Sequence, residues 1–337
     1  MPAASPSATA CTAGTAGTVD GKFERWDLAA GAQSYGIVAG PDGALWFTST
    51  SHDKLGRITT CGQLSDFPVA AGFHPTRLVV GPDQLLYATS GAGYGQGSLR
   101  QVVRMSLQGH ATYITVDGAP TSVAAGPDQA VWVATDYATN SHEEIARIAT
   151  DGSVKEVSLP ANGQGAQCGW QCPDQITTGG DGALWFTEGL GQGGFGLGRL
   201  TTSGDYQHIS PPDPTHNTPG PIATTSSGTV WYGVQRGSIV GKVNADQTVT
   251  EYKLPEADVM STPDMAADRE GGIWFLITRG QMGGPNSTDL GHIDSSGQVS
   301  VIPVPPLPPD NIANALTIGA DGRVWITDGA AIFAYSP

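Results

Sequence analysis

Hydrophobic and polar residues alternate along most of this chain in short runs, which Gly- and Asp-containing turns separate. In seven of these runs an aromatic residue follows the turn. These residues are Trp46, Tyr87, Trp132, Trp185, Trp231, Trp274 and Trp325. They lie 41 to 53 residues apart, the period expected of four-stranded propeller blades. The pattern predicts an all-β fold, a seven-bladed β-propeller of four-stranded blades.

The third repeat shows how one blade is encoded. Strands are expected over residues 123–126, 130–134, 144–149 and 153–159, where apolar and polar positions alternate. Short turns with Asp at their start separate the first strand from the second and the third from the fourth. Period-two alternation bounded by such turns is typical of β-hairpins.

The two ends of the chain predict how the ring closes. The last repeat stops after residues 331–335 and has no fourth strand, whereas residues 22–28 precede the first repeat and alternate like a fourth strand. Pairing these two segments would cover an otherwise bare sheet edge in blade seven. We therefore expect a single propeller domain over residues 21–337, after a flexible N-terminal segment over residues 1–20.

Composition restricts the possible partners. The formal net charge of −15 argues against nucleic acid, whose phosphates demand a basic surface. No apolar run is long enough for a membrane-spanning helix. We expect a monomer that takes a small-molecule or oligosaccharide substrate.

Four cysteines indicate disulfides and an oxidising compartment. In a propeller, Cys11 and Cys61 would both lie on the face of the tight turns, and Cys168 and Cys172 share one loop. We predict the pairs Cys11–Cys61 and Cys168–Cys172, which imply secretion or a cell-envelope location. A thiolate metal site is the alternative, but a second Cys/His pair at zinc spacing is missing.

The long segments of the repeats all fall on the face opposite the tight turns. Loops held by a rigid scaffold are where binding and catalysis concentrate. Aromatic residues on this face are candidates for substrate binding, with ordinary surface residues as the alternative. They are Tyr94, Tyr137, Trp170 and Phe195 in loops, and Tyr35 at the start of an inner strand.

Polar residues are expected around the central mouth of the ring on the same face. Asp174 and Asn314 start inner strands, and Glu188 and Asp328 end second strands. Oxygen ligands of this kind could hold Mg²⁺ or Ca²⁺, and Asp174 and Glu188 are also candidate catalytic carboxylates. The alternative is structural: Asp174 caps backbone amides in a turn and Glu188 pairs with a neighbouring Arg.

Histidines supply candidate bases. His74 precedes a proline at the mouth of the second repeat, and His216 lies in a Pro-rich loop before the fifth. His208 and His292 fall on strands and are expected to be structural. The same holds for the basic residues that recur in the third strands, which should pair with turn acids or pack their stems. These are Arg57, Arg104, Arg147, Arg199 and Lys242.

The repeat unit itself resembles a known family. Residues 40–48 with 56–60, and residues 172–188 with 198–202, match the pattern P-x-x-I-x-x-G-P-D-G-A-L-W-F-T-E followed by G-R-I-T-T-x-G. This pattern resembles the streptogramin lyases, also called virginiamycin B lyase-like proteins. The resemblance implies a seven-bladed propeller that opens cyclic depsipeptides by elimination, with a histidine after the proline that starts an inner strand. It also implies acidic residues that hold magnesium.

None of the seven positions that match this histidine is a histidine. They are Tyr35, Thr76, Thr121, Asp174, Gly220, Pro263 and Asn314. Three functions therefore remain open. The first is a lyase that cleaves a C–O bond in a cyclic ester or polysaccharide. The others are a non-catalytic propeller that binds a glycan or protein, and a metal-dependent hydrolase like the gluconolactonase-like propellers.

Overall fold

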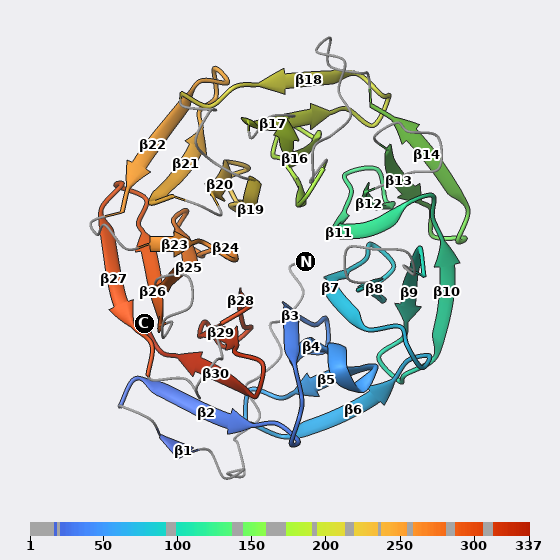
Figure 1. Ribbon diagram of the computed structural model, residues 1–337, viewed down its shortest axis with the longest axis vertical. Helices are drawn as coiled ribbons and strands as arrows, with labels where there is room; N and C mark the ends of the chain where they lie inside the picture. The colour runs from blue at the N-terminus through green and yellow to red at the C-terminus, as the bar shows by residue number, and fades with distance from the viewer. Residues whose placement is uncertain are drawn as a thin grey trace, which may run out of the picture.

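Seven antiparallel sheets surround a central axis in the computed structural model of the chain (Figure 1). The structure describes residues 17–18, 21–91, 99–136, 144–159, 173–190, 194–212, 219–234, 237–254, 259–280, 287–305 and 313–337. Within each sheet the first strand lies nearest the axis and the last at the perimeter. The predicted seven-bladed propeller is confirmed.

Blades 1 to 4 each contain four strands. Blade 1 consists of β3 (Ser34–Ala39), β4 (Leu45–Ser49), the short 3-10 helix η1 (Thr50–His52), β5 (Lys54–Ile58) and β6 (Leu64–Pro68). Blade 2 consists of β7 (Pro75–Val80), β8 (Leu86–Ser90), β9 (Gln101–Met105) and β10 (Ala111–Thr115). Blade 3 consists of β11 (Ala119–Ala125), β12 (Val131–Asp136), β13 (Glu144–Ile148) and β14 (Val154–Ser158). Blade 4 consists of β15 (Ile176–Thr178), β16 (Leu184–Leu190), β17 (Gly194–Leu200) and β18 (Tyr206–Ile209).

Blade 5 follows the same plan, and blades 6 and 7 each depart from it. Blade 5 consists of β19 (Pro219–Thr224), β20 (Val230–Val234), β21 (Ile239–Val243) and β22 (Val249–Lys253). In blade 6 the inner strand is split into β23 (Val259–Ser261) and β24 (Met265–Ala267), which both pair with β25 (Ile273–Arg279), followed by β26 (Ser287–Ile293) and β27 (Val299–Pro303). Blade 7 consists of β28 (Ala315–Ile318), β29 (Val324–Thr327), β30 (Ala331–Tyr335), β2 (Phe23–Asp27) and β1 (Gly17–Thr18). No helix among these residues could cross a membrane.

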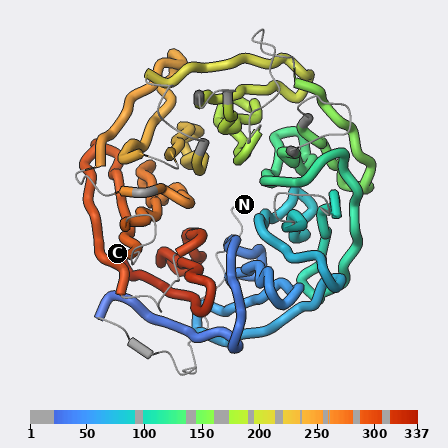
Figure 2. The backbone as a smooth tube through the Cα atoms, in the orientation of Figure 1, coloured from blue at the N-terminus to red at the C-terminus, as the bar shows by residue number. Residues whose placement is uncertain are grey.

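The N-terminal strand closes the ring, as the sequence predicts. β2 pairs antiparallel with β30, in a register that runs from Phe23 opposite Tyr335 to Asp27 opposite Ala331. Figure 2 shows the blue segment that contains β2 beside the red C-terminal strand. Beyond the predicted strand, β1 adds a fifth strand through two residues that pair with β2. The flexible segment predicted over residues 1–20 otherwise lies outside the described residues.

The seven repeat aromatics form the cores between neighbouring blades. All are at most 6% exposed. In blade 4 the indole N–H of Trp185 donates to Asp181 at 3.1 Å, and the other oxygen of that carboxylate accepts from Arg199 at 2.6 Å. The same aromatic–Asp–Arg group occurs in blades 1, 2 and 3, and in blade 6 His292 takes the place of the arginine against Asp268. The predicted pairing of third-strand basic residues with turn acids is confirmed in these blades.

Threonines at the ends of second strands fix the inner strands. The hydroxyl of Thr48 accepts from the N–H of Gly36 in its own blade at 2.8 Å and donates to the carbonyl of Thr76 in the next blade at 2.7 Å. Thr187 and Thr327 make the equivalent contacts in blades 4 and 7. The inner strand of blade 1 is thereby held from both sides, by Thr48 of its own blade and by Thr327 of blade 7.

Candidate functional site

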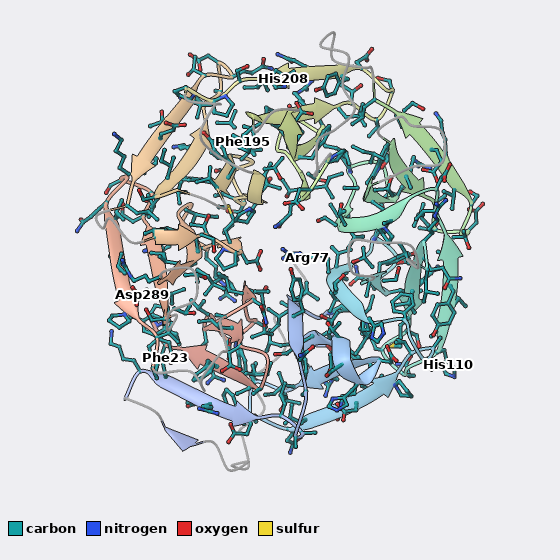
Figure 3. All side chains as sticks on the ribbon, viewed as in Figure 1. Phe23, Arg77, His110, Phe195, His208 and Asp289 are labelled. Atoms are coloured by element: carbon teal, nitrogen blue, oxygen red, sulfur yellow. The ribbon has the colours of Figure 1, made fainter. Side chains whose placement is uncertain are left out.

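A single arginine from blade 2 lies at the centre of the ring (Figure 3). Arg77 belongs to the inner strand β7, at a break in the regular pairing between Pro75 and Leu78. Its backbone N–H donates to the hydroxyl of Thr89 at 3.1 Å, which fixes the irregular backbone. A bulge of this kind re-aims a side chain out of its regular alternation.

Three other blades place side chains around this arginine. Nη1 of Arg77 lies 3.5 Å from Oδ1 of Asp264 in blade 6, and the guanidinium carbon lies 5.2 Å from the ring centroid of Tyr35 in blade 1. Asp174 in blade 4 is close enough to influence the arginine electrostatically. Groups from four blades meet only on the axis. We call Tyr35, Arg77, Asp174 and Asp264 the central cluster.

Burial and charge define the chemistry of this cluster. The side chains of Arg77 and Asp264 are only 16% and 15% exposed. Burial by itself lowers the pKa of Arg77, but electrostatic interactions with Tyr35, Asp264 and Asp174 outweigh it and raise the pKa, so the guanidinium stays charged. Burial raises the pKa of Asp264, and Arg77 together with the N–H of Leu316 offsets this only in part.

The central cluster can therefore bind an oxygen and move a proton. A fixed guanidinium offers donors to a carbonyl or carboxylate oxygen. A carboxylate whose pKa is raised is a better proton acceptor than an exposed one. Tyr35, at 36% exposed, leaves part of its ring open to a ligand.

Glu188 does not reach the mouth. Its side chain is 2% exposed, its Oε1 pairs with Nδ1 of His208, and both of its oxygens accept from the hydroxyl of Tyr206 at 2.9 Å. The strand alternation turns Glu188 to the side of Phe186, towards the outer strand β18. The prediction that Glu188 lies at the central mouth is wrong, because two partners hold it inside the blade. His208 has the expected structural contact, and its pKa is raised chiefly by the hydrogen bond with Glu188.

Asp328 and Asn314 are also committed to backbone contacts. Asp328 is 1% exposed and its Oδ1 accepts from the N–H of Ala331 at 2.5 Å. Asn314 donates to the carbonyl of Ser34 at 2.8 Å, which ties blade 7 to blade 1. Within the described parts of the chain, no three His, Cys, Asp or Glu side chains come together as metal ligands. The structure thus does not assemble the predicted set of Asp174, Glu188, Asp328 and Asn314, and Mg²⁺ or Ca²⁺ stays a prediction.

Phe195 lies in the core and not in a loop. It belongs to β17 and is fully buried, with its ring centroid 5.4 Å from that of Tyr232 in blade 5. The sequence pattern predicts a loop over residues 189–196 that contains Phe195. In the structure β16 continues to Leu190 and β17 begins at Gly194, so the loop is shorter than predicted. The prediction that Phe195 lies in a loop and binds substrate is therefore wrong.

His74 has one ring nitrogen fixed by its surroundings. Nδ1 lies 3.0 Å from the carbonyl of Thr50 and 3.4 Å from a carboxylate oxygen of Asp53. Nδ1 therefore donates its proton to that carbonyl, which leaves Nε2 as an acceptor. The side chain is 49% exposed.

Several predicted residues lie outside the described part of the chain. They are Tyr94, Tyr137, Trp170, His216, Cys11, Cys168 and Cys172. Cys61 lies in the turn between β5 and β6 and is disulfide-bonded. Its pairing with Cys11, and the pair Cys168–Cys172, stay predictions.

Arg77 was absent from the sequence-based candidates, although a signal for it exists. It follows directly after Thr76, one of the positions compared with the family histidine. At this next position the other inner strands carry Gly36, Ser122, Gln175, Pro221, Asp264 and Ala315. Arg77 is the one basic residue among the seven, and its acidic partner Asp264 occupies the same position in blade 6.

Comparison with known proteins agrees with the repeat and the fold. The sequence matches the virginiamycin B lyase family over residues 9–94 and 94–327. The chain belongs to this family. One relative, a virginiamycin B lyase from Nocardia farcinica, is 28% identical over 209 residues, which span 62% of this chain and 62% of the relative.

Solved structures similar to this family member share its fold. A structure described as a streptogramin B lyase superposes with a TM-score of 0.77 at 23% identity, covering 93% of this chain and 97% of the other. A gluconolactonase from Xanthomonas campestris gives a TM-score of 0.51 at 16% identity, covering 93% and 88%. At these identities the likeness concerns the fold alone.

Proposed function

We propose that this member of the virginiamycin B lyase family is a lyase that opens a C–O bond by elimination at the centre of the ring. The observation that carries the proposal is the buried pair of Arg77 and Asp264, 3.5 Å apart on the axis. The substrate is a cyclic ester or a polysaccharide, and a streptogramin B depsipeptide, which is a cyclic ester, is the first candidate.

The central cluster supplies the two groups that an elimination needs. A carboxylate oxygen of Asp264 takes the proton from the carbon next to a carbonyl. Its electron pair forms the new C=C bond, and the C–O bond one carbon further breaks with its pair going to the leaving carboxylate. Arg77 donates to the carbonyl oxygen, on which negative charge grows as the proton departs. The exposed part of the Tyr35 ring contacts the substrate. The negative charge of Asp174 helps to hold the guanidinium of Arg77 at the axis.

His74 is the second candidate base. Its Nε2, which no described residue contacts through a hydrogen bond, and its half-exposed position on the loop face suit proton transfer to a ligand that reaches across the rim. No step in this scheme goes through Mg²⁺ or Ca²⁺: Glu188, Asp328 and Asn314 each hydrogen-bond to other protein groups, and Asp174 lies near the guanidinium of Arg77.

The test is ring opening of a streptogramin B depsipeptide, followed by mass spectrometry. Elimination leaves the mass of the opened product unchanged, whereas hydrolysis adds one water. We expect the unchanged mass, with Arg77→Gln lowering kcat/KM by about 10²–10³-fold and Asp264→Asn by about 10²–10⁴-fold. The matched control is Arg57→Gln, which removes an arginine of the blade scaffold and should keep the activity.

Each alternative function has its own outcome. A product that has gained water would replace the lyase with a hydrolase, as in the gluconolactonase-like propellers. Binding without turnover would identify a glycan- or ligand-binding propeller. If Arg77→Gln opens the ring as fast as the unaltered protein, the central cluster is not the site. His74→Ala then tests the rim position.

We propose, in addition, that the protein acts outside the cytoplasm as a monomer, with disulfides Cys11–Cys61 and Cys168–Cys172. The disulfide-bonded state of Cys61 supports an oxidising compartment. Peptide mapping without reduction tests both pairs. A disulfide between Cys61 and Cys168 or Cys172 would overturn both predicted pairings.

A further inference from the structure

A second group of reactive side chains lies at the perimeter of blade 4, away from the axis. Oγ of Ser210 is 3.0 Å from Nε2 of His208, and Nδ1 of the same ring contacts Oε1 of Glu188. Figure 3 shows His208 on the outer strand β18, far from Arg77. A carboxylate, an imidazole and a hydroxyl are linked in this order in enzymes with a serine nucleophile, where the imidazole is the base and the carboxylate orients it.

Solvent exposure increases from Glu188 through His208 to Ser210. Glu188 is 2% exposed, the side chain of His208 is 28% exposed, and Ser210 is exposed just after the end of β18. Tyr206 donates to both oxygens of the carboxylate at 2.9 Å, which compensates its burial. The acid is thus shielded and the hydroxyl is open to solvent.

The fold makes room for this arrangement at Gly196. A Cβ atom there would lie 2.3 Å from Cε1 of His208 and 3.2 Å from Oε1 of Glu188. Any larger residue would displace the imidazole from the carboxylate. The glycine therefore fixes how closely the base and the acid approach each other.

The contacts also define the tautomer of the ring. An ionised carboxylate can only accept, so Nδ1 carries the proton that it shares with Glu188. Nε2 is then the acceptor for the O–H of Ser210, which is the direction that activates the oxygen. Without the carboxylate, the ring could equally present its N–H to the serine.

We propose that Ser210 is a nucleophile for exposed carboxylic esters, with His208 as its base and Glu188 as the residue that orients the base. Oγ of Ser210 attacks the acyl carbon while its proton passes to Nε2. The ester C–O bond breaks, and the alcohol leaves with that proton. Water then attacks the acyl carbon and gives one proton to Nε2. The bond between the acyl carbon and Oγ breaks, Oγ takes that proton back, and the carboxylic acid is released. This site is independent of the lyase function proposed for the central cluster.

The same chain contains two partial copies that serve as controls. Ser106 and His110 form a serine–histidine pair at 3.4 Å, and no carboxylate joins it among the described contacts. His292 pairs with Asp268 at 2.7 Å, and within the described part of the chain no serine hydroxyl completes it. Neither should react, because each lacks one member of the set.

The test is covalent labelling of the intact protein with a fluorophosphonate, followed by peptide mapping. We expect an adduct on Ser210 and none on Ser106. Labelling is measured on the alkaline side of neutrality, where more of the His208 ring is neutral. His208→Gln should slow labelling about 10²-fold or more, and Ser210→Ala should abolish it, while ring opening at the centre persists.

The Glu188→Gln variant distinguishes a role of Glu188 in orienting the His208 ring from a role in packing alone. As a positioning residue, Glu188 should affect the labelling rate and its pH profile, whereas a purely structural role would change only the thermal midpoint. The proposal is overturned if Ser210 stays unlabelled while a known serine hydrolase reacts under the same conditions. Equal labelling of Ser210 in the His208→Gln variant would also overturn it, whatever happens to the stability of that variant.

Discussion

Blade 5 lacks the turn carboxylate that completes the aromatic–Asp–Arg group, and replacing one residue should restore it. Ser227 stands four residues before Trp231, as Asp181 stands four residues before Trp185. The indole N–H of Trp231 is buried and has no hydrogen-bond partner among the described residues, and Lys242 lies 5.6 Å from its ring. We predict that Ser227→Asp stabilises the protein by giving both groups an acceptor.

The expected magnitude follows from the hydrogen bonds that the substitution forms and breaks. A buried donor without a partner costs about 1–3 kcal/mol, and a carboxylate in the geometry of Asp181 would satisfy it. Ser227 is exposed, and its hydroxyl contacts Thr225 at 2.8 Å and Thr229 at 3.3 Å, bonds worth about 0.5 kcal/mol each at the surface. The net increase in the free energy of unfolding should be about 1 kcal/mol. The side chain also faces a cavity of about 430 Å³ between blades 4 and 5, so space is available.

Urea unfolding followed by tryptophan fluorescence measures this increase. Ser227→Ala is the matched control, since it loses the hydroxyl contacts without adding an acceptor, and it should be slightly destabilising. The reverse change, Asp181→Ser, should lower the free energy of unfolding by about 1–3 kcal/mol. An unchanged or lower stability of Ser227→Asp, at an unchanged urea dependence, would refute the role assigned to the turn carboxylates.

Two further predictions concern acid and ring closure. Burial raises the pKa of Asp42, but hydrogen bonds from Arg57 and Trp46 outweigh it and leave the pKa below its ordinary value of 3.8. The stability this carboxylate supplies should therefore be complete above that pH and be lost as the pH falls below it. Equilibrium unfolding of Asp42→Asn should show a shallower acid loss than the unaltered protein. Phe23→Ala in the closing strand should cost about 3–5 kcal/mol, and deleting residues 17–28 should produce oligomers in size-exclusion chromatography through the bare edge of β30. A monomeric, stable deletion variant would contradict the closure.

The scaffold could be predicted from the sequence because the same strand and turn pattern occurs seven times, so an unclear strand in one repeat can be identified from the others. The seven aromatics set the period, and the missing fourth strand at one end matched the extra strand at the other. The scaffold role of Arg57 and its equivalents also followed, because a residue that recurs in each blade must serve each blade.

The site depended on information that the repeat does not carry. Whether Glu188 faces the mouth or the blade is decided by strand alternation and by its partners Tyr206 and His208, which the repeat pattern does not link to it. Arg77 stands at a break in pairing that also occurs in the inner strands of blades 1, 3 and 5, but the residue at this position differs from blade to blade. Its acidic partner lies three blades away in the ring order. Phe195 was misplaced because the length of a hairpin depends on packing against blade 5.

Ring closure by β2 also determines when this strand can fold during translation. β2 is made roughly 300 residues before its partner β30, so it waits about 15–60 s at typical elongation rates. During that interval the apolar face that will bury Phe23 and Trp26 has no sheet to join. Nascent chains of this protein should therefore be unusually dependent on whatever shields β2 until β30 has been made.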